Sequence, residues 1–260
     1  MTDISIVIPS FNQASFLPAT LDSVLGQTGV TALQVIIVDG GSTDGTLEIL
    51  RSIDDPRVTW TSEPDNGQSH AINKGMCKAD GRIVSWLNSD DIYCDGALRR
   101  VLDAFGARKA AQWLAGRVVV IGQDGQETRR AITRYKNRRL SRYSYRRLLR
   151  ENFISQMGVF WRRSFGQTVG PLDESLMYTM DYDLWLRMGR QSDPLILDEV
   201  LSQFRLHGQS KSGAVNRSQF DEQYAVAIRY FGGDSTSRAV HRFNVEKIVW
   251  SYRLLRLLGR

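Results

Sequence analysis

The sequence of 260 residues has no long apolar run: it holds no stretch of about 18 consecutive apolar residues, so we predict no helix that crosses a bilayer. The first residues, MTDISIVIPS, carry neither the basic region nor the apolar core of a signal peptide. Cysteine is scarce, since only Cys77 and Cys94 occur, and they are spaced neither as a CxxC pair nor as a metal knuckle. These absences predict a cytoplasmic protein with two free thiols.

Three loop signatures of large enzyme classes are also missing. The segment PSFNQASF, which follows the first apolar run, contains no glycine and therefore excludes the G-x-G-x-x-G dinucleotide loop. The sequence has no G-x-x-x-x-G-K-[ST] phosphate loop and no G-x-S-x-G nucleophile elbow. We therefore expect neither a dinucleotide-binding enzyme, nor a P-loop ATPase, nor a serine hydrolase.

Positive charge is in excess, and it is concentrated in one segment. The net charge is +6, and residues 129–150 hold ten Lys or Arg with tyrosines between them and no Asp or Glu. Such a segment suits single-stranded nucleic acid, an anionic lipid surface, a lipid-linked diphosphate or a solvated helix face. Apolar residues at helical spacing between Val245 and Leu258 suit an interfacial helix, a dimer helix or a helix packed within the chain. Peripheral attachment to the inner face of a membrane is therefore one alternative.

Short apolar runs alternate with amphipathic stretches in the first half of the sequence. The runs predict buried strands at residues 4–8, 33–38, 58–62 and 83–87, of which 58–62 is the weakest and suits a sheet edge. The stretches between and after them predict helices at residues 16–25, 42–50, 68–76 and 97–105. We therefore expect an α/β sandwich with a mostly parallel sheet. Later strands are expected at residues 118–121, 158–161 and 199–206, with a helix at residues 182–188.

Acidic residues follow three of the expected strands. Asp39 ends the second, Asp65 follows the third, and Asp90 and Asp91 come shortly after the fourth. Ligands of open α/β sheets bind beyond the carboxyl ends of the strands. Carboxylates gathered there suit a divalent cation bound to phosphate oxygens, although Asp and Asn are also ordinary turn residues.

Five segments in this order carry a resemblance to a known family: IVIPSFNQ, VIIVDGGSTDGT, EPDNGQSHAINKG, VSWLNSDD and MDYDLWLRM. Together they resemble the family 2 inverting nucleotide-sugar glycosyltransferases of the GT-A fold. The similarity covers roughly residues 3–210. It implies a GT-A type Rossmann-like α/β/α sandwich, and the chain has a helical C-terminal tail beyond it.

The resemblance also implies roles for individual residues. Asp91 would bind Mg²⁺ or Mn²⁺, with His207 beside the metal, and Asp181 would be the catalytic base. Relatives usually carry Glu before that base, where this sequence has Met180. Taken alone, Asp181 also suits a helix cap and His207 a structural histidine. The nucleotide sugar would be bound by Pro9, Ser10, Phe11, Asn12, Asp39, Asp65, Gln68 and Asp90.

We therefore expect an inverting glycosyltransferase that moves one sugar from a nucleoside-diphosphate sugar to a hydroxyl acceptor. A donor of the UDP or dTDP type and a glycan or lipid-linked acceptor in cell-surface polysaccharide or glycolipid synthesis are implied. Residues 1–210 would form the GT-A domain, with a nucleotide-sugar half at 1–112 and an acceptor and base half at 113–210. Residues 211–260 would form a helical basic tail, for which a role in a homodimer is an alternative.

Two other functions are weighed against this one. A nucleotidyltransferase also uses paired aspartates, but it would want a glycine-rich basic loop after the first strand, which is missing. A basic nucleic-acid-binding protein would explain residues 129–150 but not the acidic strand ends, so nucleic acid is not an expected partner.

Overall fold

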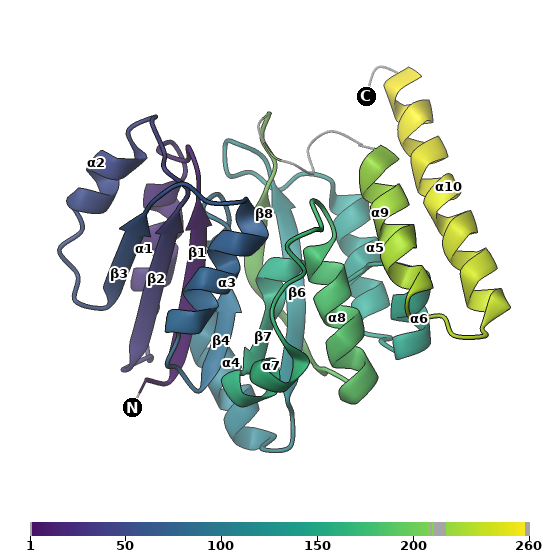
Figure 1. Ribbon diagram of the computed structural model, residues 1–260, viewed down its shortest axis with the longest axis horizontal. Coiled ribbons are helices and arrows are strands. Elements are labelled where there is room, and N and C mark those ends of the chain that lie inside the picture. Colours follow the sequence, from purple (N-terminus) through teal and green to yellow (C-terminus); the bar gives the residue numbers. More distant parts are fainter. Residues whose placement is uncertain (1, 209, 211–216, 258–260) are drawn as a thin grey trace.

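The computed structural model describes residues 2–208, 210 and 217–257, with side chains to residue 247, and it shows a single sheet with helices on both faces (Figure 1). The strand order is β3-β2-β1-β4-β7-β6-β8-β5. The strands are β1 (Ile4–Ser10), β2 (Leu33–Asp39), β3 (Val58–Ser62), β4 (Ile83–Trp86), β5 (Ile92–Tyr93), β6 (Trp113–Ile121), β7 (Val159–Arg162) and β8 (Leu195–Arg205).

The first four strands in space are parallel, as predicted, and β3 lies at the edge of the sheet. The register places Ser10 opposite Asp39, and Asp39 opposite Ser62, so the carboxyl ends of β1, β2 and β3 are level. β7 pairs antiparallel with β4 and β6, and β5 pairs antiparallel with β8, while β6 and β8 are parallel. The predicted α/β sandwich with a mostly parallel sheet is confirmed, and β8 begins four residues earlier than the expected 199.

Both faces of the sheet are apolar because the strands are nearly continuous apolar runs. On one face Val7, Ile36 and Val38 pack with α3 (Gln68–Lys78) and α8 (Met180–Gln191), and on the other Ile6 and Ile37 pack with α1 (Leu17–Leu25) and α4 (Ala97–Ala107). The helices are α1 (Leu17–Leu25), α2 (Thr46–Arg51), α3 (Gln68–Lys78), α4 (Ala97–Ala107), α5 (Arg130–Leu140), α6 (Tyr145–Arg150), α7 (Arg163–Val169), α8 (Met180–Gln191), α9 (Arg217–Ile228) and α10 (Ser235–Leu257).

The two C-terminal helices pack against the rest of the chain. α9 lies against α8, and α10 lies against α9 and α6 (Figure 1). Val226, Ala227 and Phe231 are buried in the same cluster as the α8 side chains. The described part of the tail is therefore packed within the chain, while the apolar side chains expected at 248–258 lie outside the described side chains. Among the described residues, no helix combines the length and the apolar composition needed to cross a membrane.

Candidate functional site

Asp39 ends β2 and holds the turn that follows it. Its carboxylate is fully buried and accepts hydrogen bonds from the Gly41 N–H at 3.1 Å and the Ser42 N–H at 2.9 Å. The Ser42 hydroxyl donates to the other oxygen, and the Ser62 hydroxyl donates to Oδ2 at 2.7 Å. The side chain that the resemblance assigns to the nucleotide therefore fixes the loop between β2 and α2.

The loop after β1 is tied to this turn through Asn12. Asn12 adopts a left-handed backbone conformation with φ of 53°, and its N–H donates to the Ser42 hydroxyl at 2.7 Å. Its side-chain oxygen accepts from the Thr43 N–H at 2.9 Å. Asn12 therefore joins two loops that the sequence separates by about 30 residues.

The residues just before Asn12 keep groups available for a ligand. Pro9 and Ser10 are buried at the end of strand β1, and the Ser10 hydroxyl has no hydrogen-bond partner among the described residues. Phe11 is 59% exposed, which is unusual for a large apolar side chain in this chain. A buried free hydroxyl beside an exposed ring offers both a hydrogen bond and a stacking surface.

Asp65 and Gln68 reach the same edge from the segment after β3. Asp65 accepts a hydrogen bond from the Gly67 N–H at 2.7 Å. A Cβ atom on Gly40 would lie 2.9 Å from the Asp65 carboxylate, so the glycine permits this close approach. Gln68 begins α3, and its side-chain amide donates to Asn88 Oδ1 at 2.8 Å. These contacts connect the loops that follow β2, β3 and β4.

Asp90 and Asp91 are adjacent but lie in different surroundings. Asp91 is fully buried and accepts from the Arg205 N–H at 3.0 Å and the Asn88 amide at 3.2 Å. Burial raises the pKa of the Asp91 carboxyl well above its usual range, and the charge of Asp90 adds to this rise. The Asp90 side chain is 16% exposed, and its Oδ2 lies 2.9 Å from Nε2 of His207. The structure therefore brings His207, which follows β8, to Asp90.

Asp90 and His207 together offer a carboxylate oxygen and an imidazole nitrogen at one point of the edge. Such a pair suits Mn²⁺ or Mg²⁺ when phosphate oxygens and waters complete the coordination shell. Within residues 2–208, 210 and 217–257, no three His, Cys, Asp or Glu side chains are grouped so that they could hold a metal ion. The residues present fit a cation shared with a bound diphosphate better than an all-protein cage.

Asp181 lies in the first turn of α8 and at this same edge. α8 ends shortly before β8 begins, and β8 runs parallel to β6, so α8 runs from the carboxyl edge towards the amino edge. Trp185 stacks on Trp86 at the end of β4, with ring centroids 5.7 Å apart. Residues i and i+4 of a helix share a face, so Asp181 lies one turn beyond Trp185 towards the loop after β4.

The Asp181 carboxylate is half-buried, and burial raises its pKa to about 6. The Tyr182 N–H donates to it, and the Lys136 ammonium also favours the charged form, so both oppose the rise. The N-cap of α8 is Thr179, and Asp181 follows two residues later in the first turn of the helix. A carboxylate with a pKa near neutral pH can accept a proton during a reaction.

Lys136 was not predicted from the sequence as a site residue. Lys136 lies on α5 inside the basic segment, and its Nζ is 3.5 Å from the Ser155 hydroxyl. Burial lowers the pKa of Lys136, while the charges of Asp181 and Glu151 oppose that change. The buried residues of α5 are Thr133 and Leu140. Lys136 stands three residues after one and four before the other, so helical periodicity could have placed it on the buried face.

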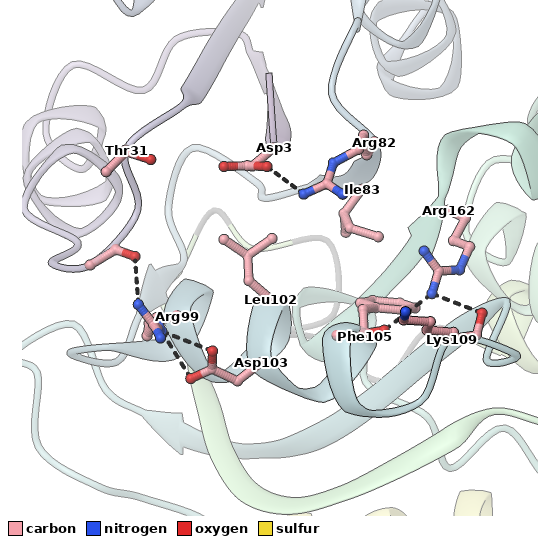
Figure 2. A pocket seen from close by; sticks show the side chains of 12 residues that line it. Asp3, Thr31, Arg82, Ile83, Arg99, Leu102, Asp103, Phe105, Lys109 and Arg162 are labelled. Carbon is pink, nitrogen blue, oxygen red and sulfur yellow. Dashed lines mark hydrogen bonds and ion pairs between the residues drawn. The ribbon is translucent and has the colours of Figure 1, made fainter. Parts of the chain in front are cut away.

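A cavity of about 540 Å³ lies elsewhere, at the amino edge of the sheet (Figure 2). Asp3 and Arg82, which line it, precede β1 and β4, and no predicted site residue contributes to it. Figure 2 shows Arg82 directed at Asp3 and Arg99 directed at Asp103, in ion pairs. We therefore place the candidate site at the carboxyl edge, where the side chains from separate loops meet, and not in this cavity.

Known proteins resemble this chain in sequence. The family model described as glycosyl transferase family 2 matches residues 5–168. A PGL/p-HBAD biosynthesis glycosyltransferase of Mycobacterium bovis is 32% identical over 189 residues, which are 70% of this chain and 68% of that protein. An uncharacterised glycosyltransferase of Rickettsia prowazekii is 29% identical over 82% of this chain and 67% of its own length. The chondroitin synthase of Escherichia coli is 29% identical over 80% of this chain but only 30% of its own length.

Solved structures resemble the chain in fold. Residues 1–349 of S. aureus TarS, in complex with UDP-GlcNAc, superpose with a TM-score of 0.69 at 16% identity, covering 92% of this chain and 69% of that one. A mannosyltransferase from Pyrobaculum calidifontis superposes with a TM-score of 0.66 at 15% identity, covering 98% of this chain and 80% of that one. These neighbours confirm the predicted GT-A fold. The family model spans more than half of the sequence, and the chain therefore belongs to glycosyl transferase family 2.

Proposed function

We propose that this glycosyltransferase moves one sugar from a nucleoside-diphosphate sugar to a hydroxyl acceptor, with inversion at the anomeric carbon. The observation that carries the proposal is the half-buried Asp181 carboxylate, with a pKa of about 6, at the edge where the loops after β1, β2, β3 and β4 meet. A general base works best when its pKa is near the operating pH. One such base suffices for a single displacement.

The donor nucleotide would bind against the loop after β1. The Ser10 hydroxyl and the exposed Phe11 ring are available for the base, and Asp39, Asn12, Asp65 and Gln68 hold the surrounding loops in place. Pro9 continues β1 into this loop. TarS and the mannosyltransferase are complexes with UDP-GlcNAc and GDP-Man respectively. We favour a UDP or dTDP donor on the family resemblance.

Asp90 and His207 would hold Mg²⁺ or Mn²⁺, as their geometry fits a cation shared with phosphate oxygens. This assignment moves the metal-facing role from Asp91 to Asp90, because Asp91 is fully buried and hydrogen-bonded to Arg205 and Asn88. A divalent cation supplies positive charge for the departing diphosphate. The neighbouring mannosyltransferase structure is a complex with Mn²⁺.

Asp181 would accept the proton of the acceptor hydroxyl while the oxygen of that hydroxyl bonds to the anomeric carbon. The bond from that carbon to the donor phosphate breaks, and its electron pair leaves with the nucleoside diphosphate. The attack comes from the face opposite the leaving group, so the configuration inverts. Lys136 would favour the charged, proton-accepting form of Asp181 between turnovers.

The acceptor would be a glycan or lipid-linked sugar of a polysaccharide or glycolipid. The exposed Arg134 and Arg138 lie on α5 with Lys136, and the exposed Arg142 follows just after that helix. Their charge suits a lipid-linked diphosphate and a peripheral position on an anionic membrane surface. We also propose that the chain divides at residues 112 and 210 into a donor half, an acceptor half and a tail. The tail, residues 211–260, would form a homodimer.

The test is a donor screen followed by one substitution. Thermal shift with UDP-, dTDP- and GDP-sugars and MnCl₂ identifies the donor, because a bound ligand stabilises the fold by mass action. Transfer to a panel of simple glycosides is then followed by release of the nucleoside diphosphate. We expect Asp181→Asn to keep the donor-dependent stabilisation and to lose transfer about 10²- to 10⁴-fold. Equal turnover of this variant and the parent would reject Asp181 as the base, and Asp54→Asn, an exposed site, is the matched control.

A further inference from the structure

Glu222 on α9 binds the segment that leads into α8. Its Oε1 accepts hydrogen bonds from the N–H groups of Tyr178 at 2.9 Å and Thr179 at 2.8 Å, and from the Thr179 hydroxyl at 2.7 Å. Its Oε2 accepts from the Met177 N–H at 3.0 Å. One carboxylate therefore satisfies three consecutive backbone donors, two residues before Asp181.

This contact is suited to a charged carboxylate. The N-terminus of a helix carries partial positive charge and unpaired N–H groups, and α8 has no side-chain cap of its own at Thr179. Burial opposes the charge on Glu222, but the hydrogen bonds from Thr179, Tyr178 and Met177 outweigh it and hold the pKa of Glu222 below its usual value. Glu222 is therefore ionised at neutral pH.

α9 is fixed against α8 at a second place, which makes the Glu222 contact rigid. The Tyr230 hydroxyl, just after α9, donates to the buried Asp183 carboxylate at 2.8 Å, and Asp183 also pairs with Arg187 of α8. Val226 and Ala227, between the two contacts, are fully buried. The two helices therefore cannot shift along each other without breaking charged hydrogen bonds and exposing apolar side chains.

We propose that Glu222 is a positioning residue for the reaction: by binding the N–H groups of residues 177–179 it fixes the place and the electrostatic surroundings of Asp181. This inference rests on the proposed role of Asp181 as the base. The residue before Asp181 is the buried, apolar Met180, so α8 itself supplies no second carboxylate there. Glu222 supplies one from an element that lies outside the segment matched by the family model.

Two charged groups from neighbouring elements act on Asp181. Lys136 of α5 lowers its pKa, and Glu222 of α9 raises it. Removing the Glu222 charge should therefore shift the titration of Asp181 to lower pH. Loss of a purely structural contact would solvate Asp181 and lower its pKa in the same direction, so a variant that keeps the charge, Glu222→Asp, separates the two effects.

The experiment uses Glu222→Gln and, as a matched control, Asp221→Asn. The control makes the same change of charge at the next residue of α9, where Asp221 forms an exposed ion pair with Arg217. Hydrogen exchange measures the amides of residues 177–179, and carbon NMR of aspartate side chains follows the Asp181 titration. Neither measurement needs a substrate.

We expect Glu222→Gln to exchange these amides about tenfold faster and to titrate Asp181 at lower pH, with Asp221→Asn like the parent. Glu222→Asp, which keeps the charge on a shorter arm, should recover part of the titration shift. Unchanged exchange and an unchanged titration in Glu222→Gln would overturn the proposal. If Asp181→Asn keeps full transfer while the Glu222 effects appear, the assigned base is wrong and the Glu222 contact stands.

Discussion

The turn after β2 and the start of α8 both place an aspartate at the carboxyl edge of the sheet, but they hold it in opposite ways. The Asp39 carboxylate is fully buried and accepts four hydrogen bonds from three nearby residues, Gly41, Ser42 and Ser62. The Asp181 carboxylate is half-buried and accepts from the Tyr182 N–H, and burial raises its pKa to about 6. Both oxygens of Asp39 therefore accept hydrogen bonds from its own turn and from β3, whereas Asp181 accepts from the Tyr182 N–H.

The difference separates two uses of the same side chain. A buried carboxylate whose oxygens accept several hydrogen bonds stabilises the turn that donates them. A poorly solvated carboxylate is costly to keep charged and therefore ready to take up a proton. We therefore expect substitutions at the two positions to change the free energy of unfolding with opposite signs.

The largest effect is expected for Asp39→Ala. This change leaves two N–H groups and two hydroxyls of a buried turn without their acceptor, so we expect a loss of about 3–5 kcal/mol in the free energy of unfolding. Urea denaturation at neutral pH measures it. Asp54→Ala, at an exposed site, should change stability by less than about 0.5 kcal/mol. A loss of less than about 1 kcal/mol for Asp39→Ala would show that the turn does not depend on this carboxylate.

The opposite sign is expected for Asp181→Asn. The folded pKa of about 6 lies above the ordinary value of 3.8, so the charged form destabilises the fold as pH rises through about 6, and below pH 3.8 the effect is absent. The difference between these two pKa values corresponds to at most about 3 kcal/mol in the free energy of unfolding. Partial exposure of Asp181 reduces this to about 2 kcal/mol.

Asparagine has no charge to bury, so Asp181→Asn should be more stable than the parent at pH 8 by about 2 kcal/mol. The advantage should shrink as pH falls through 6 and disappear near pH 4. Urea denaturation of both proteins at the two pH values tests this. A variant that is less stable than the parent at pH 8 contradicts the account of Asp181.

The sequence predicted the Asp39 region well because its contacts are local or follow from strand register. Continuous apolar runs imply a parallel sheet, parallel strands bring their carboxyl ends to one edge, and the polar residues after Asp39 are ordinary turn formers. The strand at the edge and the loops that carry Asp39, Asp65 and Asp90 were all anticipated. The sequence did not predict which of the paired aspartates is buried. The N–H group that binds the buried Asp91 belongs to Arg205 of β8, more than a hundred residues away.

The surroundings of Asp181 could not be predicted in the same way. The resemblance predicted a role for Asp181 itself. The charged groups that act on it, Lys136 and Glu222, come from α5 and α9. The spacing of residues within these helices does not predict which helix packs on α8. Helical periodicity gives the buried face of α5 and so the direction of Lys136, yet not its partner. Long-range packing therefore decided the chemistry of this aspartate.

A smaller effect is expected for a substitution at Asp90, the carboxylate proposed to bind the cation. With UDP and MnCl₂, Asp90→Asn should lose the part of the thermal stabilisation that EDTA removes from the parent, because it removes a carboxylate ligand of the proposed cation. We expect an affinity for Mn²⁺ about tenfold weaker, or about 1.4 kcal/mol. Asp95→Asn, an exposed site just after β5, is the control. Retention of the full Mn²⁺ response in Asp90→Asn would argue for Asp91 as the metal ligand after all.

The smallest effect is expected for Lys136→Met, and it runs opposite to the effect of Glu222→Gln. The ammonium of Lys136 lowers the pKa of Asp181, so its removal should shift the acid limb of the kcat profile to higher pH. Turnover should fall about threefold at pH 6 and change little at pH 8, where Asp181 is ionised in both proteins. Lys109→Met, which removes an exposed lysine, should leave the profile in place. Opposite displacements of the same limb in the Lys136 and Glu222 variants would assign that limb to Asp181, because both charges act on this one carboxylate from different helices.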